Sequence, residues 1–326
     1  MPDWSRLAEI IKAHQRFCLV SHIRPDADAL GSELGMCGVL EAMGKSVRIV
    51  NAQSTPPNLR FLDPGKKINT LGAEVQAADL DDVEVLIVLD TSAWGQLGSM
   101  GDVIRNSKAR KLIIDHHVSQ DDLGAELFKD TTAEATGRLV TDFAKHQGIT
   151  LTPAVATALF AAVATDTGWY RFGSTTGDTY RCGGALVDAG ARPADIYKAL
   201  YEQESIARLH LVGRVLSRAT SELGGRLIYT FVLRSDFSEL GALPSDTEDV
   251  INTTLQVAGT EVAAIFVELL TGGVKVSLRS RSQVNCSQVA ELFGGGGHKA
   301  AAGATLPDPI EIVQNKVLDA VRAAMG

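Results

Sequence analysis

The first half of the chain alternates short apolar runs with helical patterns, and this rhythm constrains the fold more than any other feature of the sequence. Runs rich in β-branched and aliphatic residues are typical of strands that are buried on both faces. Between the first two runs lies ALGSELGMCGVLEAMG, in which apolar residues recur at helical spacing before Gly44. The alternation predicts βαβ units and therefore an α/β fold with a mostly parallel sheet flanked by helices. The four runs are FCLVS (17–21), SVRIV (46–50), VEVLIVLD (83–90) and KLIIDHH (111–117).

The second half mixes strands and helices in a different order, which predicts a smaller C-terminal α/β domain. A chain of 326 residues is long enough for two such domains. We expect a first domain over 1–204, a connector helix over about 193–220, and a second domain over 221–326. The strand-like segments are RLIYTFVLR, EVAAIFVELL and GVKVSLRSR, and the helical ones are DTEDVINTTLQ, CSQVAELF and PIEIVQNKVLDAVRAAMG.

Composition excludes several classes of protein. Hydrophobic residues make up 45% and charged residues 21% of the chain, which is ordinary for a soluble globular protein. We expect a cytoplasmic protein without membrane contact, because neither a long apolar stretch nor a signal-type apolar core is present. A net charge of −8 argues against coating long duplex DNA, but it is compatible with a small anionic substrate. The scattered cysteines, without a CxxC pair, are expected to be buried free thiols.

Acidic and imidazole side chains collect where the predicted strands and one apolar helix end. Because the carboxyl ends of parallel strands meet at one edge of a sheet, we expect these side chains to converge. Carboxylate oxygens with one or two imidazoles suit Mn²⁺ or Mg²⁺ better than Zn²⁺. Two such cations could relieve the repulsion among the carboxylates and clamp a phosphoryl centre. The residues are His22, Asp26 and Asp28 after the first run, Asp90 after the third, Asp115, His116 and His117 in the fourth, and Asp166 after ALFAAVA.

Taken singly, each of these residues has a simpler explanation. An aspartate after a strand is often a helix cap or a turn former. Asp26 and Asp28 could merely be first-turn acids that favour the dipole of the following helix. The metal-centre hypothesis rests on the coincidence of four such segments in one predicted domain.

A run of glycines in the second domain predicts a site for an anionic ligand. One glycine suffices to end a helix, whereas GGGGHKAAAG has four in succession, which permit close backbone approach to a ligand. Two strand-borne arginines, two residues apart, are expected to point to the same face and to bind phosphate. The simpler alternative is a flexible turn with a solvated basic edge. The expected ligand-binding residues are Arg279, Arg281, Gly295, Gly296, Gly297, His298 and Lys299.

In order and spacing, the segments HIRPDADALGS, VLDTS, IIDHH and TDTGWYRF resemble the four motifs of the DHH phosphoesterase superfamily. The C-terminal LRSRSQVNCSQVAELFGGGGHKAAAG is similar to the accessory domain called DHHA1. At this length, the combination resembles the bacterial nanoRNase and 3′-phosphoadenosine-5′-phosphate phosphatase branch. The resemblance implies a DHH catalytic domain and a DHHA1 substrate-binding domain across a cleft.

The resemblance also implies a role for each residue of the site. It makes Asp90 a bridge between two metals, His117 a group that meets the substrate phosphate or assists the leaving group, and Asp115 an acid that orients an imidazole. Ala27 stands where the family commonly has glycine, which affects only fine geometry. In the second domain, Arg279, Arg281 and His298 would hold the distal end of the substrate. The implied ligands are His22, Asp26 and Asp90 for one metal, and Asp28, Asp90, His116 and Asp166 for the other.

The function implied is Mn²⁺-dependent hydrolysis of short single-stranded RNA to mononucleotides, of 3′-phosphoadenosine-5′-phosphate to AMP, or of both. Two divalent cations are expected, with Mg²⁺ or Co²⁺ as alternatives to Mn²⁺. A phosphodiesterase for linear or cyclic dinucleotides, an inorganic pyrophosphatase and a non-catalytic nucleotide-binding module stay open as alternatives. The protein is expected to be a monomer or homodimer.

Overall fold

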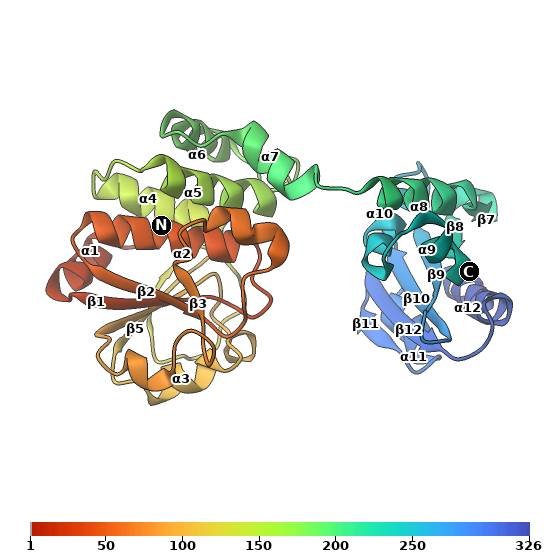
Figure 1. Cartoon of the computed structure of the whole chain (residues 1–326), viewed down its shortest axis with the longest axis horizontal. Helices are drawn as coiled ribbons and strands as arrows, with labels where there is room; N and C mark the ends of the chain where they lie inside the picture. The colour runs from red at the N-terminus through yellow and green to blue at the C-terminus, as the bar shows by residue number, and fades with distance from the viewer. Residues whose placement is uncertain (1) are drawn as a thin grey trace. The chain divides into compact units, whose positions relative to one another are not determined.

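The structure is a computed structural model, and it describes residues 2–326. The chain divides into two units, of which the first ends at Gln203 and the second runs from Glu204 to Gly326 (Figure 1). Each unit has its own six-stranded sheet and its own buried apolar clusters. The α/β fold class predicted from the sequence is confirmed.

The sheet of the first unit is parallel throughout, with strand order β3-β2-β1-β4-β5-β6. The four apolar runs of the sequence form β1, β2, β4 and β5. The sequence did not predict β3 and β6, which are short strands at the two edges of the sheet. The strands are β1 (Arg16–Val20), β2 (Ser46–Asn51), β3 (Ile68–Thr70), β4 (Val85–Leu89), β5 (Arg110–Asp115) and β6 (Glu126–Lys129).

Helices cover both faces of this sheet because side chains alternate along each strand. In β1, Phe17 and Leu19 belong to the cluster under α1, α2, α4 and α5, whereas Cys18 and Val20 belong to the cluster on the α3 side (Figure 1). The helices α6 and α7 lie over α5. Their bounds are α1 (Trp4–Ala13), α2 (Ala27–Ala42), α3 (Met100–Asn106), α4 (Thr136–His146), α5 (Pro153–Asp166), α6 (Gly177–Asp188) and α7 (Pro193–Tyr201), with 3₁₀ turns η1 (Pro57–Leu62), η2 (Ala77–Leu80) and η3 (Trp94–Gln96).

Glycines allow α2 and α5 to pack closely. A Cβ atom added at Gly31 would lie 2.4 Å from the carbonyl oxygen of Ala158, and one at Gly35 would lie 2.3 Å from a methyl carbon of Leu159. Real Cβ atoms do not approach neighbours this closely, so side chains at these positions would push the two helices apart. The tight packing matters for the site, because Asp28 is in the first turn of α2 and Asp166 is the last residue of α5.

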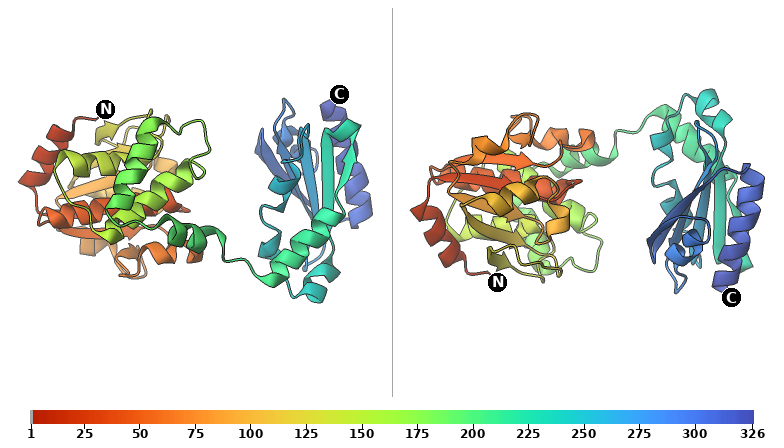
Figure 2. Two further views of the ribbon diagram at one scale, coloured as in Figure 1. Left: turned by 90° about the horizontal axis from the view of Figure 1, so that it is seen from above. Right: turned by 90° about the horizontal axis from the view of Figure 1, so that it is seen from below.

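The second unit is a mixed sheet of order β11-β12-β10-β9-β8-β7, in which only the β8–β9 pair is parallel. The helices α8, α9 and α10 cover one face, and α11 and α12 cover the other (Figure 2). The elements are α8 (Ile206–Ser217), β7 (Thr220–Glu222), η4 (Leu223–Gly225), β8 (Leu227–Val232), α9 (Arg234–Leu240), η5 (Pro244–Thr247), α10 (Val250–Thr254), β9 (Val262–Glu268), β10 (Val274–Ser280), α11 (Cys286–Glu291), β11 (Gly296–His298), β12 (Ala301–Leu306) and α12 (Ile310–Met325).

The single connector helix expected over 193–220 is instead two helices. The first, α7, ends at Tyr201, and Glu202 leaves the helical region with φ −114° and ψ 39°. Ser205 is extended, and its hydroxyl accepts a hydrogen bond from the backbone N–H of Arg208 at 3.0 Å. A serine in this role is the N-cap of a new helix. The apolar pattern therefore resumes in α8, although the backbone between α7 and α8 is not helical.

Two expectations from composition can be checked in the described residues. Cys18, Cys37, Cys182 and Cys286 are buried free thiols, as predicted. Within residues 2–326, no helix combines the length and the apolar character that crossing a bilayer would require.

Candidate metal centre and glycine-rich pocket

The acidic and imidazole residues of the first unit lie where the strand order reverses. The strands β1 and β4 are neighbours, but the chain continues from β1 to β2 on one side and from β4 to β5 on the other. Ligands of parallel sheets bind at such a point, where the connections diverge. His22, Asp26 and Asp28 follow β1, and Asp90 follows β4. The topology therefore delivers these side chains to the edge of the sheet at which α/β proteins bind their ligands.

Three overlapping groups of possible metal ligands form there, and all six residues expected to bind metal belong to at least one group. Asp90 links them, because its Oδ2 lies 3.3 Å from Nε2 of His22 while its Oδ1 lies 3.6 Å from Nε2 of His116. Its two oxygens thus face two separate sets of donors. The groups, each with its ligand atoms within 4.8 Å of one another, are His22–Asp26–Asp90, Asp28–His116–Asp166 and Asp90–His116–His117.

The tautomers of two imidazoles follow from their hydrogen bonds. Nδ1 of His22 lies 2.9 Å from the carbonyl oxygen of Ile23, and Nδ1 of His116 lies 3.2 Å from that of Ala133. Because a carbonyl oxygen can only accept, each Nδ1 carries the proton. Nε2 of each ring is then the nitrogen that faces the carboxylates, and it is the nitrogen that a metal would take.

Asp28 is held by the first turn of α4. The backbone N–H groups of Thr136 and Gly137 each donate to one of its oxygens at 2.8 Å, and Ser32 Oγ donates at 3.0 Å. The hydroxyl of Thr136 donates to Asp90 at 2.9 Å. The sequence analysis missed Thr136 and Gly137. The available signal was a Thr-Gly pair at the start of a helical pattern, where free N–H groups favour a carboxylate.

Asp26 has two structural roles. Its Oδ1 accepts hydrogen bonds from the backbone N–H groups of Asp28 and Ala29 at 3.0 Å each, so it is the N-cap of α2. The same side chain belongs to the group with His22 and Asp90. The helix-cap explanation is therefore correct, and it leaves the side chain within reach of the other possible ligands His22 and Asp90.

The electrostatics of the carboxylates fit divalent cations. Burial, and then the neighbouring Asp28, raise the pKa of Asp90 well above its usual range, and its side chain is only 2% exposed. The same two causes raise the pKa of Asp166 to about 6, and burial raises that of Asp28. Converging carboxylates that resist ionisation are stabilised by cations, and oxygen donors with imidazoles are the ligand set that Mn²⁺ and Mg²⁺ accept.

Asp115 is fully buried and orients His117. Its Oδ1 accepts from the backbone N–H of His117 at 3.0 Å and from Nδ1 of the same residue at 2.9 Å. Its Oδ2 accepts from Ser92 Oγ at 2.5 Å and pairs with Lys129 Nζ at 3.1 Å. Burial alone would raise the pKa of Asp115, but these bonds outweigh burial and hold it at about 2. The bond to Asp115 raises the pKa of His117, which is half-exposed.

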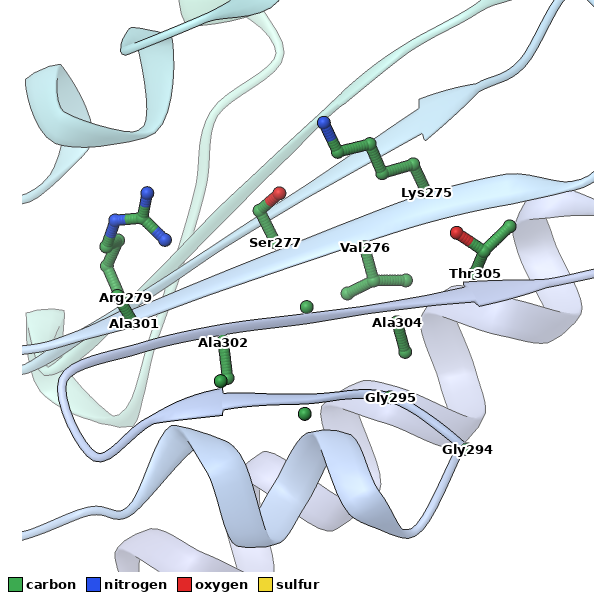
Figure 3. Close-up of a pocket in the computed structure, with 13 residues that line it drawn as sticks. Lys275, Val276, Ser277, Arg279, Gly294, Gly295, Ala301, Ala302, Ala304 and Thr305 are labelled. Carbon is green, nitrogen blue, oxygen red and sulfur yellow. The ribbon is translucent and has the colours of Figure 1, made fainter. Parts of the chain in front are cut away.

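The second unit contains a cavity of about 650 Å³ beside the glycine run. Lys275, Ser277 and Arg279 project from β10 to the same side of the sheet, as the alternation of a strand requires (Figure 3). The cavity therefore combines cationic and hydroxyl groups with exposed glycine backbone. Its lining is Lys275, Val276, Ser277, Arg279, Gly294, Gly295, Gly296, Gly297, Ala301, Ala302, Gly303, Ala304 and Thr305.

Only some of the expected ligand-binding residues of the second unit line this cavity. Arg279 and the expected glycines Gly295, Gly296 and Gly297 line the cavity, whereas Arg281, His298 and Lys299 do not belong to its lining. β10 ends at Ser280, so the strand alternation does not extend to Arg281, whose guanidinium donates to the carbonyl oxygen of Leu255. Lys299 Nζ donates to Gln283 Oε1 at 2.9 Å. The sequence analysis missed Lys275, Ser277 and Thr305.

The glycines of the run have different local surroundings. A Cβ at Gly295 would lie 2.2 Å from the carbonyl oxygen of Gly303, and one at Gly297, where φ is +146°, would lie 2.6 Å from that of Ala301. These two glycines let β11 pack against β12. A Cβ at Gly296 would meet nothing within 4 Å, so packing does not explain the glycine there.

Comparisons with known proteins agree with both units. The model of the DHH family, N-terminal domain, matches residues 16–163, and the DHHA1 domain model matches residues 224–326. A Thermus thermophilus protein named bifunctional oligoribonuclease and PAP phosphatase NrnA is 32% identical, over 98% of this chain and 94% of its own length. The Bacillus subtilis protein of the same name is 25% identical, over 93% of each chain. The crystal structure of an exopolyphosphatase-related protein from Bacteroides fragilis has a TM-score of 0.82 at 25% identity, over 98% of this chain and 95% of its own.

Proposed function

Because this chain belongs to the DHH family and carries a DHHA1 domain, we propose that it hydrolyses short single-stranded oligoribonucleotides to mononucleotides and 3′-phosphoadenosine-5′-phosphate to AMP. The family makes the protein a metal-dependent phosphoesterase. The choice of substrates is our proposal, and the names of the Thermus and Bacillus relatives support it.

The observation that carries the proposal is the position of Asp90 between two sets of donors. Its Oδ2 faces His22, and its Oδ1 faces His116. We assign His22, Asp26 and Asp90 to one divalent cation, and Asp28, Asp90, His116 and Asp166 to a second, with Mn²⁺ as the ion. When bound, such a pair of cations lowers the pKa of water and draws charge from the phosphoryl oxygens.

His117 supplies the proton in this mechanism. Its Nδ1 is bonded to Asp115, so its Nε2 is the nitrogen available to a substrate, and the same bond to Asp115 raises the pKa of the ring, which shifts it toward the protonated form. As water adds to phosphorus, the bond from phosphorus to the leaving oxygen breaks. Nε2 then donates a hydrogen bond or a proton to that oxygen, while Asp115 stabilises the cationic ring.

The cavity of the second unit is proposed to bind the terminal nucleotide of the substrate. Lys275 and Arg279 carry positive charge, Ser277 carries a hydroxyl group, and Gly296 presents backbone at an open position. A volume of about 650 Å³ lies within the usual range for pockets that hold small ligands. A terminal-nucleotide site alone would also accept the end of a long strand, so the proposed preference for short substrates rests on the oligoribonuclease names of the relatives.

The proposal is tested by initial rates of the purified protein with Mn²⁺ on a dinucleotide, a five-mer, a twenty-mer, 3′-phosphoadenosine-5′-phosphate and pyrophosphate. We expect fast turnover of the dinucleotide and the bisphosphate, and little on the twenty-mer. Dominant hydrolysis of pyrophosphate or of the twenty-mer would overturn the substrate assignment while leaving the metal centre intact. A cyclic dinucleotide, added as a sixth substrate, tests the remaining phosphodiesterase alternative.

A further inference from the structure

The ammonium group of Lys129 is almost enclosed, with 9% of its side chain exposed. Lys129 is the last residue of β6 and is paired in register with Asp115 on β5. Its Nζ lies 2.7 Å from Ser92 Oγ, 2.7 Å from the carbonyl oxygen of Ser119 and 3.1 Å from Asp115 Oδ2. An ammonium group has three N–H donors, and three acceptors surround this one. Lys129 is therefore committed to contacts inside the protein and is not available to a substrate.

These contacts fix the carboxylate of Asp115 from the side opposite to His117. One oxygen accepts two hydrogen bonds from His117, and the other meets Ser92 and Lys129. With four donors on two oxygens, the carboxylate cannot rotate without breaking bonds on both sides. The plane of the carboxylate in turn sets the direction in which Nδ1 of His117 points.

Lys129 also fixes the backbone that carries His117. Its bond to the carbonyl oxygen of Ser119 holds the chain two residues after His117, and its pairing with Asp115 holds the chain two residues before. An ion pair that served only to join β5 to β6 would need no contact with this loop. The contacts of Lys129 thus converge on the segment from Asp115 to Ser119.

We propose that Lys129 is a positioning residue for phosphoester hydrolysis, which acts through Asp115 and the Ser119 backbone to hold the imidazole of His117. The inference rests on the proposed role of His117. Lys129 does not touch the substrate, and its contribution is the orientation of a ring that does.

The test is a double-mutant cycle between Lys129→Met and His117→Ala, with Mn²⁺ and the small diester diphenyl phosphate, whose phenolate leaving group gains from protonation far more than p-nitrophenolate does. Methionine keeps the length of the side chain but removes its charge and donors. In the wild-type background we expect Lys129→Met to lower kcat by about 10–100-fold with little change in KM, as for other residues that orient a site. In the His117→Ala background the same change should cost roughly two-fold or less, because the ring that it positions is gone. Equal losses in both backgrounds would overturn the proposal.

A matched control is Lys111→Met on the neighbouring strand β5, where the ammonium donates to the carbonyl oxygen of Ser107 at 2.9 Å. It should leave kcat unchanged. Thermal unfolding followed by circular dichroism identifies a variant that does not fold. If Lys129→Met does not fold, the cycle is repeated with Ser92→Ala in its place, since Ser92 donates to the same oxygen of Asp115. Its loss in kcat should also vanish in the His117→Ala background, and a loss that persists there would count against the proposal.

A second readout does not depend on catalysis. In metal-free protein, the proton on Nδ1 of His117 should give an imidazole N–H signal in ¹H–¹⁵N spectra, assigned by its absence from His117→Ala. We expect Lys129→Met to broaden or remove this signal and Lys111→Met to preserve it, and an unchanged signal in Lys129→Met would contradict the proposal. Diphenyl phosphate separates this test from the substrate assignment, because a wild type that cleaves the diester but not the dinucleotide refutes only the latter.

Discussion

Asp90 combines three features that are costly for stability. Its side chain is 2% exposed, burial and Asp28 raise its pKa, and its backbone has φ of +64°, a conformation that non-glycine residues adopt at a cost. Residues that keep such features are commonly functional. At the scale of single residues, the metal centre is therefore a place where stability is lost in the metal-free protein.

Replacing Asp90 by asparagine should separate activity from stability. Asp90→Asn preserves shape and an acceptor for the hydroxyl of Thr136, but it removes the charge that the two proposed cations would share. We expect hydrolysis to fall to background. In EDTA at pH 7.5, the free energy of unfolding should rise by on the order of 1 kcal/mol, since each unit of raised pKa corresponds to about 1.4 kcal/mol. Rates on a dinucleotide and urea titrations measure the two effects.

Asp102→Asn is the matched control for this change. Asp102 lies on α3, is 80% exposed and pairs with Arg105 on the surface. It should alter neither activity nor stability measurably. Near-normal turnover of Asp90→Asn would refute the two-cation assignment.

Glu33 makes the stability of the metal-free protein depend on pH. It is fully buried, and burial raises its pKa from 4.5 to about 8, although Asn51 donates to its Oε2 at 2.9 Å. The folded protein therefore keeps a proton that the unfolded chain releases, so this group lowers stability as pH rises from about 4.5 to about 8. Glu33→Gln imitates the protonated form. It should stabilise the protein by roughly 1–3 kcal/mol at pH 8 and much less at pH 5.

Urea unfolding in EDTA at the two pH values measures the effect. Glu41→Gln is the control on the same helix, because Glu41 is exposed and paired with Lys67. A stabilisation by Glu33→Gln that is equal at both pH values would show that the titration of Glu33 is not its source.

At the scale of elements, the glycine strand β11 offers a test of the cavity. Gly296→Val introduces a side chain where a Cβ meets nothing, in a strand that tolerates valine. We expect normal folding and a KM for the dinucleotide raised at least about ten-fold, which corresponds to about 1.4 kcal/mol of binding. The rate on bis(p-nitrophenyl) phosphate, which is too small to need the cavity, should not change.

Gly295→Val is the contrasting variant, because its Cβ would collide with the carbonyl oxygen of Gly303. It should lower the thermal midpoint, whereas Gly296→Val should not. If Gly296→Val binds the dinucleotide as the wild type does, the cavity is not the site of the terminal nucleotide.

Sequence patterns predicted the elements with long apolar runs and missed those determined by tertiary contacts. Strands β1, β2, β4 and β5 are buried and aliphatic, so their sequence reveals them, whereas β3 and β6 are short edge strands without such a run. The clustered aspartates and histidines were recognisable by residue type. Lys129 was not, since a lone lysine has no distinctive spacing, and only the fold brings it to Asp115. The Thr-Gly pair at Thr136 marks the start of a helix, but only the fold shows that its hydroxyl meets Asp90.

At the scale of the whole molecule, the metal centre and the tryptophans share one unit. Trp4, Trp94 and Trp169 all lie in the first unit, and each unit has its own apolar clusters. We expect Mn²⁺ to bind the folded form at the proposed site and so to raise the unfolding midpoint seen by tryptophan fluorescence. The part of the circular dichroism signal that belongs to the second unit should unfold at a midpoint independent of Mn²⁺. A single transition that shifts in both signals would show that the two units unfold together.

The break between α7 and α8 bears on how chains with these two units could have evolved. Residues 202–205 separate α7 from α8, and the boundary between two units that bury separate cores falls within them, after Gln203. A gene segment that encodes the second unit can therefore be exchanged by recombination at this junction without rebuilding the first. If the second unit recognises the substrate as proposed, phosphoester chemistry and substrate recognition can be inherited separately, and one metal centre can serve a succession of recognition domains.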